Sequence, residues 1–207
     1  MKFQDIVSRL FESEDFQSFK EEKPDAFPCS GFFSIDVNEK DNKQHIDYFV
    51  PSENKVYSFK LEAGGERVPT EFQDDKKPEK VSLNHEFNFN EMKDLVTNAM
   101  SEKGMKNQIQ KYLFSFQHSP ETGRDYLLGT IFISGLALLK IKINLEKKKI
   151  ESFEKKSFMQ MMNVFKKGGK KEKGESKADS EQGKEIQKQP EEDSSNEQKQ
   201  DSKVSSQ

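Results

Sequence analysis

The chain has 207 residues and a formal net charge of −3, with 34% charged residues and only 31% hydrophobic residues. Its single cysteine excludes an intramolecular disulfide and argues against a cysteine-based zinc site. The most apolar stretch, 126–139, is shorter than the roughly 20 residues of a membrane-spanning helix, and the first residues lack the pattern of a secretory signal. We therefore expect a soluble, cytoplasmic protein without a transmembrane segment.

The composition changes sharply near the end of the chain. The aliphatic side chains of 166–207 are Ala178, Ile186 and Val204, and Lys, Glu, Gln and Ser dominate the remainder. Such a segment cannot bury enough apolar surface to offset its ordering entropy. We predict a disordered, charged tail over 166–207.

The first part of the chain predicts one helix followed by strands. Helical spacing runs through 3–20, with apolar positions at Phe3, Ile6, Val7, Leu10, Phe11 and Phe19. Alternating patterns then predict strands at 30–37, 45–50 and 55–61, the last two forming a hairpin across the turn residues 51–54. A connector follows over 66–86, with room for a short strand near 70–73.

The second part repeats this order. Asn88 and Glu91 have capping-box spacing before a helix that ends near Gly104. The apolar stripe of that helix is Met92, Leu95, Val96, Ala99 and Met100. Strands are predicted at 109–117, 124–134, 138–145 and 150–154, and the apolar run 124–134 predicts burial on both faces. A short closing helix is predicted over 157–165.

These patterns predict an α+β fold built from two tandem units. The helical stripes superpose at an offset of 89 residues and the strands at about 80 to 84, which indicates one helix and a three-stranded antiparallel meander in each unit. The units would form one sheet with both helices on the same face, or pack as two layers. The predicted domains are 1–83, 84–165 including the closing helix, and the tail.

The order of elements resembles the cystatin-like and PepSY-like folds in outline. The stretches 25–36, 45–51 and 134–144 are also similar to segments of small, uncharacterised archaeal proteins. This resemblance implies no activity, cofactor or site residue.

Few residues carry recognisable chemistry. His45, His85 and His118 are far apart and form no helical metal-binding motif, so we expect surface or structural roles. Cys29 has no base beside it in the sequence and is predicted to be a buried structural thiol. With no nucleophile elbow or phosphate-binding glycine loop, we predict no catalytic, cofactor or metal residue, no cofactor, and no enzyme.

The distribution of charge along the chain is more informative than these single residues. The segment 140–173 has 12 lysines against four acidic residues. It could bind an anionic partner, or the lysines could protect an exposed strand edge. The absence of arginine argues against sequence-specific nucleic-acid recognition. The candidate anion-binding residues are Lys140, Lys142, Lys147, Lys148, Lys149, Lys155, Lys156, Lys166 and Lys167.

Three functional hypotheses follow from these patterns. The first is a non-enzymatic binding or adaptor module with a protein partner, since the core is well patterned and no chemistry is clustered. The second is electrostatic association with nucleic acid, the ribosome or another polyanion through 140–173. The third is an enzyme of unfamiliar type, which requires a pocket between the two units where histidine, cysteine or carboxylate side chains converge.

Overall fold

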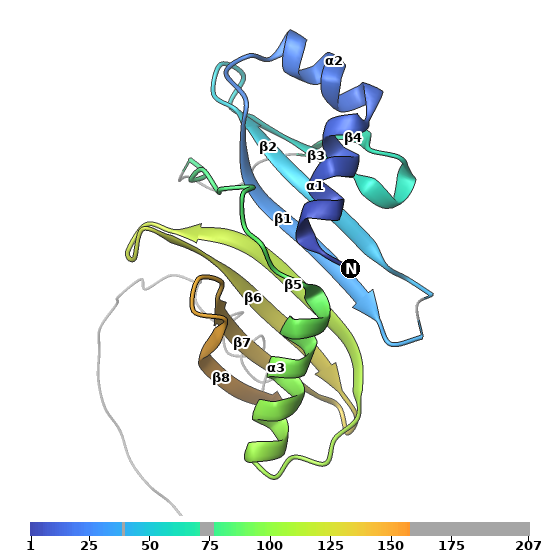
Figure 1. Ribbon diagram of the computed structural model, residues 1–207, viewed down its shortest axis with the longest axis vertical. Helices are drawn as coiled ribbons and strands as arrows, with labels where there is room; N and C mark the ends of the chain where they lie inside the picture. Colours follow the sequence, from blue (N-terminus) through green and yellow to red (C-terminus); the bar gives the residue numbers. More distant parts are fainter. Residues whose placement is uncertain (39, 71–76, 158–207) are drawn as a thin grey trace, which may run out of the picture. The chain divides into compact units, whose positions relative to one another are not determined.

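The computed structural model describes residues 1–38, 40–70 and 77–157, which all belong to one compact unit. The predicted tail, Lys166, Lys167 and all but the first residue of the predicted closing helix lie outside the described residues. The described part is a mixed α+β structure of helices and an antiparallel sheet (Figure 1). Its helices are α1 (Phe3–Glu12), α2 (Glu14–Glu22) and α3 (Phe89–Glu102), with a short 3-10 helix, η1, at Leu61–Ala63.

Eight antiparallel strands form a single sheet in the order β4-β3-β2-β1-β5-β6-β7-β8. The strands are β1 (Phe27–Asp36), β2 (Lys43–Val50), β3 (Lys55–Lys60), β4 (Glu66–Thr70), β5 (Ile109–Ser119), β6 (Arg124–Ile133), β7 (Ala137–Asn144) and β8 (Lys149–Ser157). The seam between the two parts of the chain is β1 against β5, where Phe33 pairs with Phe114. Of the two arrangements left open by the sequence, the single sheet is therefore correct.

The prediction of three-stranded meanders was wrong, because each helical region is followed by four strands. The short strand expected near 70–73 lies at 66–70, where β4 pairs with β3. The last strand is longer than predicted and continues to Ser157, which pairs with Ala137. Backbone pairing with the neighbouring strand sets these ends more strongly than side-chain periodicity does.

The helix predicted over 3–20 is broken at Ser13. Its hydroxyl accepts a hydrogen bond from the Phe16 backbone N–H at 3.2 Å, so Ser13 caps α2. The Phe11 side chain of α1 is 49% exposed, whereas Phe19 of α2 is fully buried. Phe11 was wrongly assigned to the buried stripe.

The helix of the second part of the chain, α3, follows its prediction closely. The Asn88 side chain caps α3 by accepting from the Asn90 N–H at 2.9 Å, and Gly104 follows the helix with a φ of 65°. Glu91, expected to complete a capping box, instead forms an ion pair with Lys148. The first residues of α1 and α3 are Phe3 and Phe89, so the two helices start 86 residues apart in the sequence.

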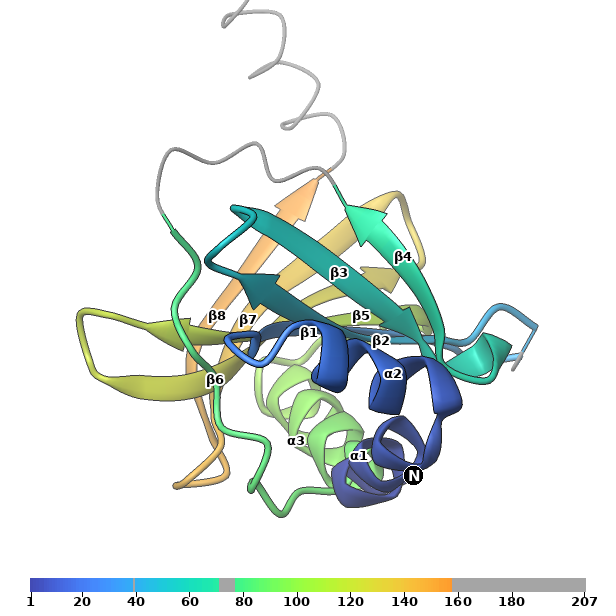
Figure 2. The same ribbon diagram turned by 90° about the horizontal axis from the view of Figure 1, so that it is seen from above.

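All three helices pack on one face of the sheet (Figure 2). Phe3 of α1 lies against Phe33 and Phe116, while Phe89 of α3 lies against Phe33 and Phe114. Phe19 of α2 contacts the outer strands β2 and β3. The buried side chains of both parts of the chain thus form one continuous core.

The opposite face of the sheet explains a second error. Strand β6 lies inside the sheet but alternates between buried residues, such as Leu127 and Ile131, and the partly exposed Leu128 and Phe132, at 37% and 39%. Burial on both faces was predicted, but the described helices cover only one. Within the described residues, no helix has the length and apolarity needed to cross a bilayer.

Candidate functional site

A cavity of about 620 Å³ lies between the β5–β6 hairpin and residues 77–88, the described part of the connector that leads to α3. We call it the connector cavity. Side chains from both parts of the chain line it, including Phe11, Tyr48, Lys80, His85, His118 and Arg124. It is larger than a cavity of about 590 Å³ at the ends of β1 and β5 and one of about 380 Å³ at the helix starts.

Two histidines meet on one carboxylate at this cavity. His85 Nε2 lies 2.8 Å from Asp125 Oδ2, and His118 Nδ1 lies 2.7 Å from Asp125 Oδ1. The Ser82 backbone N–H donates to Oδ2 at 2.8 Å. We call His85, His118 and Asp125 the histidine cluster.

Local structure places each member of the histidine cluster. His118 and Asp125 are cross-strand partners in the β5–β6 hairpin, beside its turn. His85 comes from the connector, and its ring packs edge-on against the buried Phe116. Gln4 of α1 donates to the carbonyl oxygens of Leu83 and His85, both at 2.8 Å, and so holds this part of the connector in position.

The carboxylate of the cluster is held in its ionised form. Burial of Asp125, which is only 8% exposed, opposes ionisation, but the Ser82 N–H and the two histidines outweigh it and lower the pKa of Asp125. An ionised carboxylate only accepts hydrogen bonds, so His85 Nε2 and His118 Nδ1 must both carry hydrogen. This fixes the tautomer of each ring whenever it is neutral.

The second nitrogen of each ring remains available. Among the described residues, nothing hydrogen-bonds to His85 Nδ1 or His118 Nε2. A neutral imidazole offers a lone pair at this atom, and a protonated one offers a hydrogen. Each imidazole can therefore accept a hydrogen bond from a ligand, or donate one to it, while keeping its hydrogen bond to Asp125.

Metal binding and covalent catalysis find less support. Residues 1–38, 40–70 and 77–157 contain no group of three or more histidine, cysteine, aspartate or glutamate side chains arranged to hold a metal ion. The Ser82 hydroxyl accepts a hydrogen bond from the Asn84 N–H at 3.3 Å and, within the described residues, forms none with either imidazole.

The remaining candidates from the sequence lie elsewhere. Cys29 is buried in a small cluster with Phe49 and Val56, as predicted for a structural thiol, and burial raises its pKa to about 12. His45 lies against η1, with its Nε2 2.9 Å from Glu62 Oε1. Neither residue lines the connector cavity.

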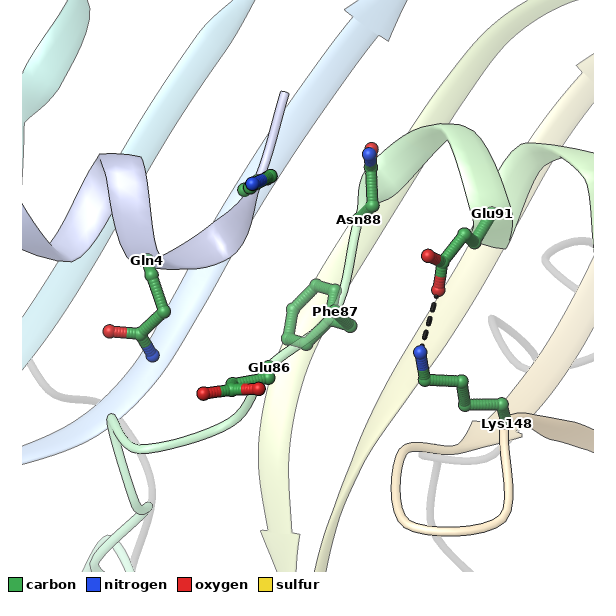
Figure 3. Close-up of a pocket in the computed structure, with 7 residues that line it drawn as sticks. Gln4, Glu86, Phe87, Asn88, Glu91 and Lys148 are labelled. Atoms are coloured by element: carbon green, nitrogen blue, oxygen red, sulfur yellow. Dashed lines mark hydrogen bonds and ion pairs between the residues drawn. The ribbon is translucent and has the colours of Figure 1, made fainter.

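The cavity at the helix starts adjoins the same connector (Figure 3). Glu91 and Lys148 form an ion pair of 2.8 Å across it, linking α3 to the turn between β7 and β8. Gln4 also lines this cavity, and its side-chain amide donates a hydrogen bond to the Leu83 carbonyl of the connector. We interpret this cavity as a structural junction, since the Glu91–Lys148 ion pair spans it.

The lysines predicted to bind anions are spread over β7, β8 and their turn. Lys140 and Lys142 lie on the sheet face opposite the helices, where Lys142 Nζ sits 4.4 Å from the centre of the Tyr126 ring. Lys147, Lys148 and Lys149 lie at the turn, at the far end of β7.

The β8 lysines have polar neighbours. Lys155 Nζ lies 3.4 Å from Asn107 Oδ1, and Lys156 Nζ lies 3.3 Å from Glu154 Oε1. Lys140 also has Glu154 as its cross-strand partner. Lys140 and Lys156 thus lie beside Glu154, and the role of the lysines in anion binding stays a prediction.

Sequence reasoning missed the histidine cluster. The predicted strands 109–117 and 124–134 flank the turn residues Pro120 to Gly123, and a tight hairpin around them makes His118 and Asp125 opposite neighbours. That signal could have identified half of the cluster. Nothing in the spacing places His85, because the connector has no periodic pattern.

Comparison with known proteins adds little to this geometry. No family model matches the chain, and no curated protein matches it. Among solved structures, a chain from Clostridium difficile 630 titled a "putative lipoprotein" is similar over 69% of this chain and 91% of its own, with 15% identity and a TM-score of 0.46.

Proposed function

We propose that this protein is a non-enzymatic binding module whose partner inserts a polar group into the connector cavity. The observation that carries the proposal is the pair of imidazoles fixed on the buried Asp125, each with a second ring nitrogen that no described residue hydrogen-bonds. Their anchoring fixes the binding geometry before any ligand arrives, which lowers the ordering cost of binding. A protein partner presenting a short polar segment fits a cavity of this size.

Ligand screening on the full chain tests this function. Thermal shift against a panel of short peptides and small metabolites should give ligands whose effect is lost in His118→Ala. The control is His45→Ala, which removes a histidine paired to a carboxylate outside the cavity. Ligands that bind both variants equally would place the binding site elsewhere and refute the proposal.

The same geometry favours a second candidate, a general acid–base enzyme. A carboxylate that orients an imidazole is the arrangement used by hydrolytic histidines, and here one carboxylate orients two. With Cys29 outside the cavity lining and the Ser82 hydroxyl bonded to the connector backbone, water would be the nucleophile. Turnover in a hydrolase panel that is abolished by His118→Ala would establish this candidate over the binding module.

Association with a polyanion through the lysines of 140–173 is a separate alternative. Lys140, Lys147 and Lys149 are exposed and form no ion pair with a described residue. Reversing these three to glutamate should weaken binding of single-stranded RNA and flatten its salt dependence. The matched control reverses Lys40, Lys55 and Lys77, and equal loss in both triple variants would rule out this site.

We further infer that the two parts of the chain are structural repeats. The strand order is symmetric about the β1–β5 seam. The helix starts also bind each other reciprocally, with Phe3 N–H donating to the Phe87 carbonyl and Phe89 N–H to the Met1 carbonyl, both at 3.0 Å. Coexpressed fragments 1–83 and 84–207 should then assemble, and failure to copurify would count against this division.

A further inference from the structure

The protonation state of the histidine cluster decides what the connector cavity can bind. When His85 and His118 are neutral, their free nitrogens only accept hydrogen bonds. When they are protonated, both nitrogens donate, and each ring carries a positive charge. Asp125 hydrogen-bonds to both rings in either state, because each ring donates to it through its other nitrogen.

The other charged groups lining the cavity nearly cancel. Lys80 comes from the connector and Arg124 from β6, while Glu146 follows β7. Glu146 lies 3.4 Å from the Arg124 guanidinium, and Asp125 is enclosed by its own donors. Tyr48 also lines the cavity as a neutral phenol, since burial raises its pKa. The lining is therefore close to neutral until the imidazoles take up protons, and gains two positive charges when both do.

Two adjacent protonated imidazoles with a lysine and an arginine beside them are suited to an oxyanion. We propose that the connector cavity binds a doubly charged oxyanion group, of the sulfate or phosphate-ester kind, together with protons taken up by His85 and His118. This proposal rests on the proposed function, because it specifies the group that the partner inserts. It makes binding strongest where histidine is charged and weak where it is neutral.

Calorimetric titration of the full-length protein with sodium sulfate tests the inference. Sulfate keeps its charge across the range in which histidine ordinarily titrates, about pH 5 to 8, so any pH dependence belongs to the protein. At constant ionic strength we expect affinity at the acidic end to exceed that at the alkaline end by about tenfold or more. The binding heat should also vary with the ionisation enthalpy of the buffer, which reports proton uptake.

Single variants assign this effect to the cavity. His85→Gln and His118→Gln should each lower sulfate affinity at the acidic end by about tenfold, the effect of one charge-assisted hydrogen bond. His45→Gln is the matched control and should leave the sulfate affinity unchanged. If the cluster variants do not fold, Lys80→Glu tests the same cavity, because Lys80 is exposed and forms no ion pair with a described residue.

The outcomes separate this inference from the proposed function. Equal sulfate affinity at both ends of the pH range, or full affinity in the His85→Gln and His118→Gln variants, overturns the inference. Binding of zinc instead of sulfate overturns it as well. If peptides from the ligand screen still need His118 under those results, the binding function stands; if no ligand of any class needs it, the binding function fails too.

Discussion

Asp125 brings three donors onto one buried carboxylate, and two of them come from the connector. Replacing it with asparagine removes the charge and leaves one donor facing an amide nitrogen. We expect Asp125→Asn to lower the free energy of unfolding by about 1–3 kcal/mol, the cost of a buried group left without its partner. Urea denaturation monitored by circular dichroism measures this loss.

The matched control is Asp41→Asn. Asp41 is paired with Lys111 at 2.6 Å, but its side chain is half exposed, so solvent screens the pair and the loss should be clearly smaller. Equal losses in the two variants would show that the hydrogen bonds of Asp125 contribute no special stability.

The contribution of Asp125 should also depend on pH. Because the fold lowers the pKa of Asp125, its ionised form adds stability that is complete above the unfolded value of about 3.9 and is lost as the pH falls through the folded pKa. The stability difference between wild type and Asp125→Asn should therefore shrink below about pH 4. Denaturation curves at a series of pH values check this, and a constant difference down to pH 3 or so would contradict it.

At the scale of single elements, the sequence was informative wherever one side-chain pattern decided the structure. The hairpin of β2 and β3 and the cap and glycine stop of α3 were predicted correctly, because alternation, turn residues and capping are local signals. The break at Ser13 was missed because Phe19 was taken to continue the apolar stripe past it. The ends of β4 and β8 and the place of His85 depend on contacts with distant segments, which no local pattern encodes.

The break between α1 and α2 yields an element-scale prediction. Ser13→Ala removes the hydroxyl that caps α2 and should destabilise the protein by about 1 kcal/mol. Ser18→Ala, at an exposed position within the same helix, should be neutral or slightly stabilising because alanine is the better helix former. Thermal denaturation of both variants tests this pair, and equal effects would mean that Ser13 is not a functional cap.

The two glycines after η1 provide a second matched pair. Gly64 and Gly65 both have positive φ, but a Cβ at Gly64 would meet open space, whereas one at Gly65 would lie 2.5 Å from the Ser13 Cβ. Gly64→Ala should cost roughly 1–2 kcal/mol from backbone strain alone. Gly65→Ala should cost about 1–3 kcal/mol more, because η1 must move away from the cap of α2. Equal midpoints in urea would indicate that this contact relaxes freely.

At the scale of the whole molecule, the seam between the two parts of the chain is part of the core. The Phe3 ring stacks on Phe87 at 4.7 Å and meets Phe33 of β1 and Phe116 of β5 at 6.1 and 5.3 Å. The backbones of the two helix starts also bind each other at this point. A side chain that touches both parts couples their stabilities, so we expect the described residues to unfold as one cooperative unit.

Phe3→Ala tests this coupling. The loss of a fully buried ring should cost about 3–5 kcal/mol. The space left by the Phe3 ring lies at the seam between the two parts. Hydrogen exchange should therefore accelerate in α3 as well as in α1, although the substitution is in α1 alone. Phe11→Ala, which removes the exposed ring of the same helix, should cost less than about 1 kcal/mol and leave exchange in α3 unchanged. Two outcomes would contradict this coupling: faster exchange confined to α1, or two separate unfolding transitions. Either one would show that the β1–β5 seam joins two independently stable parts. The connector cavity would then lie between two parts rather than within one cooperative core.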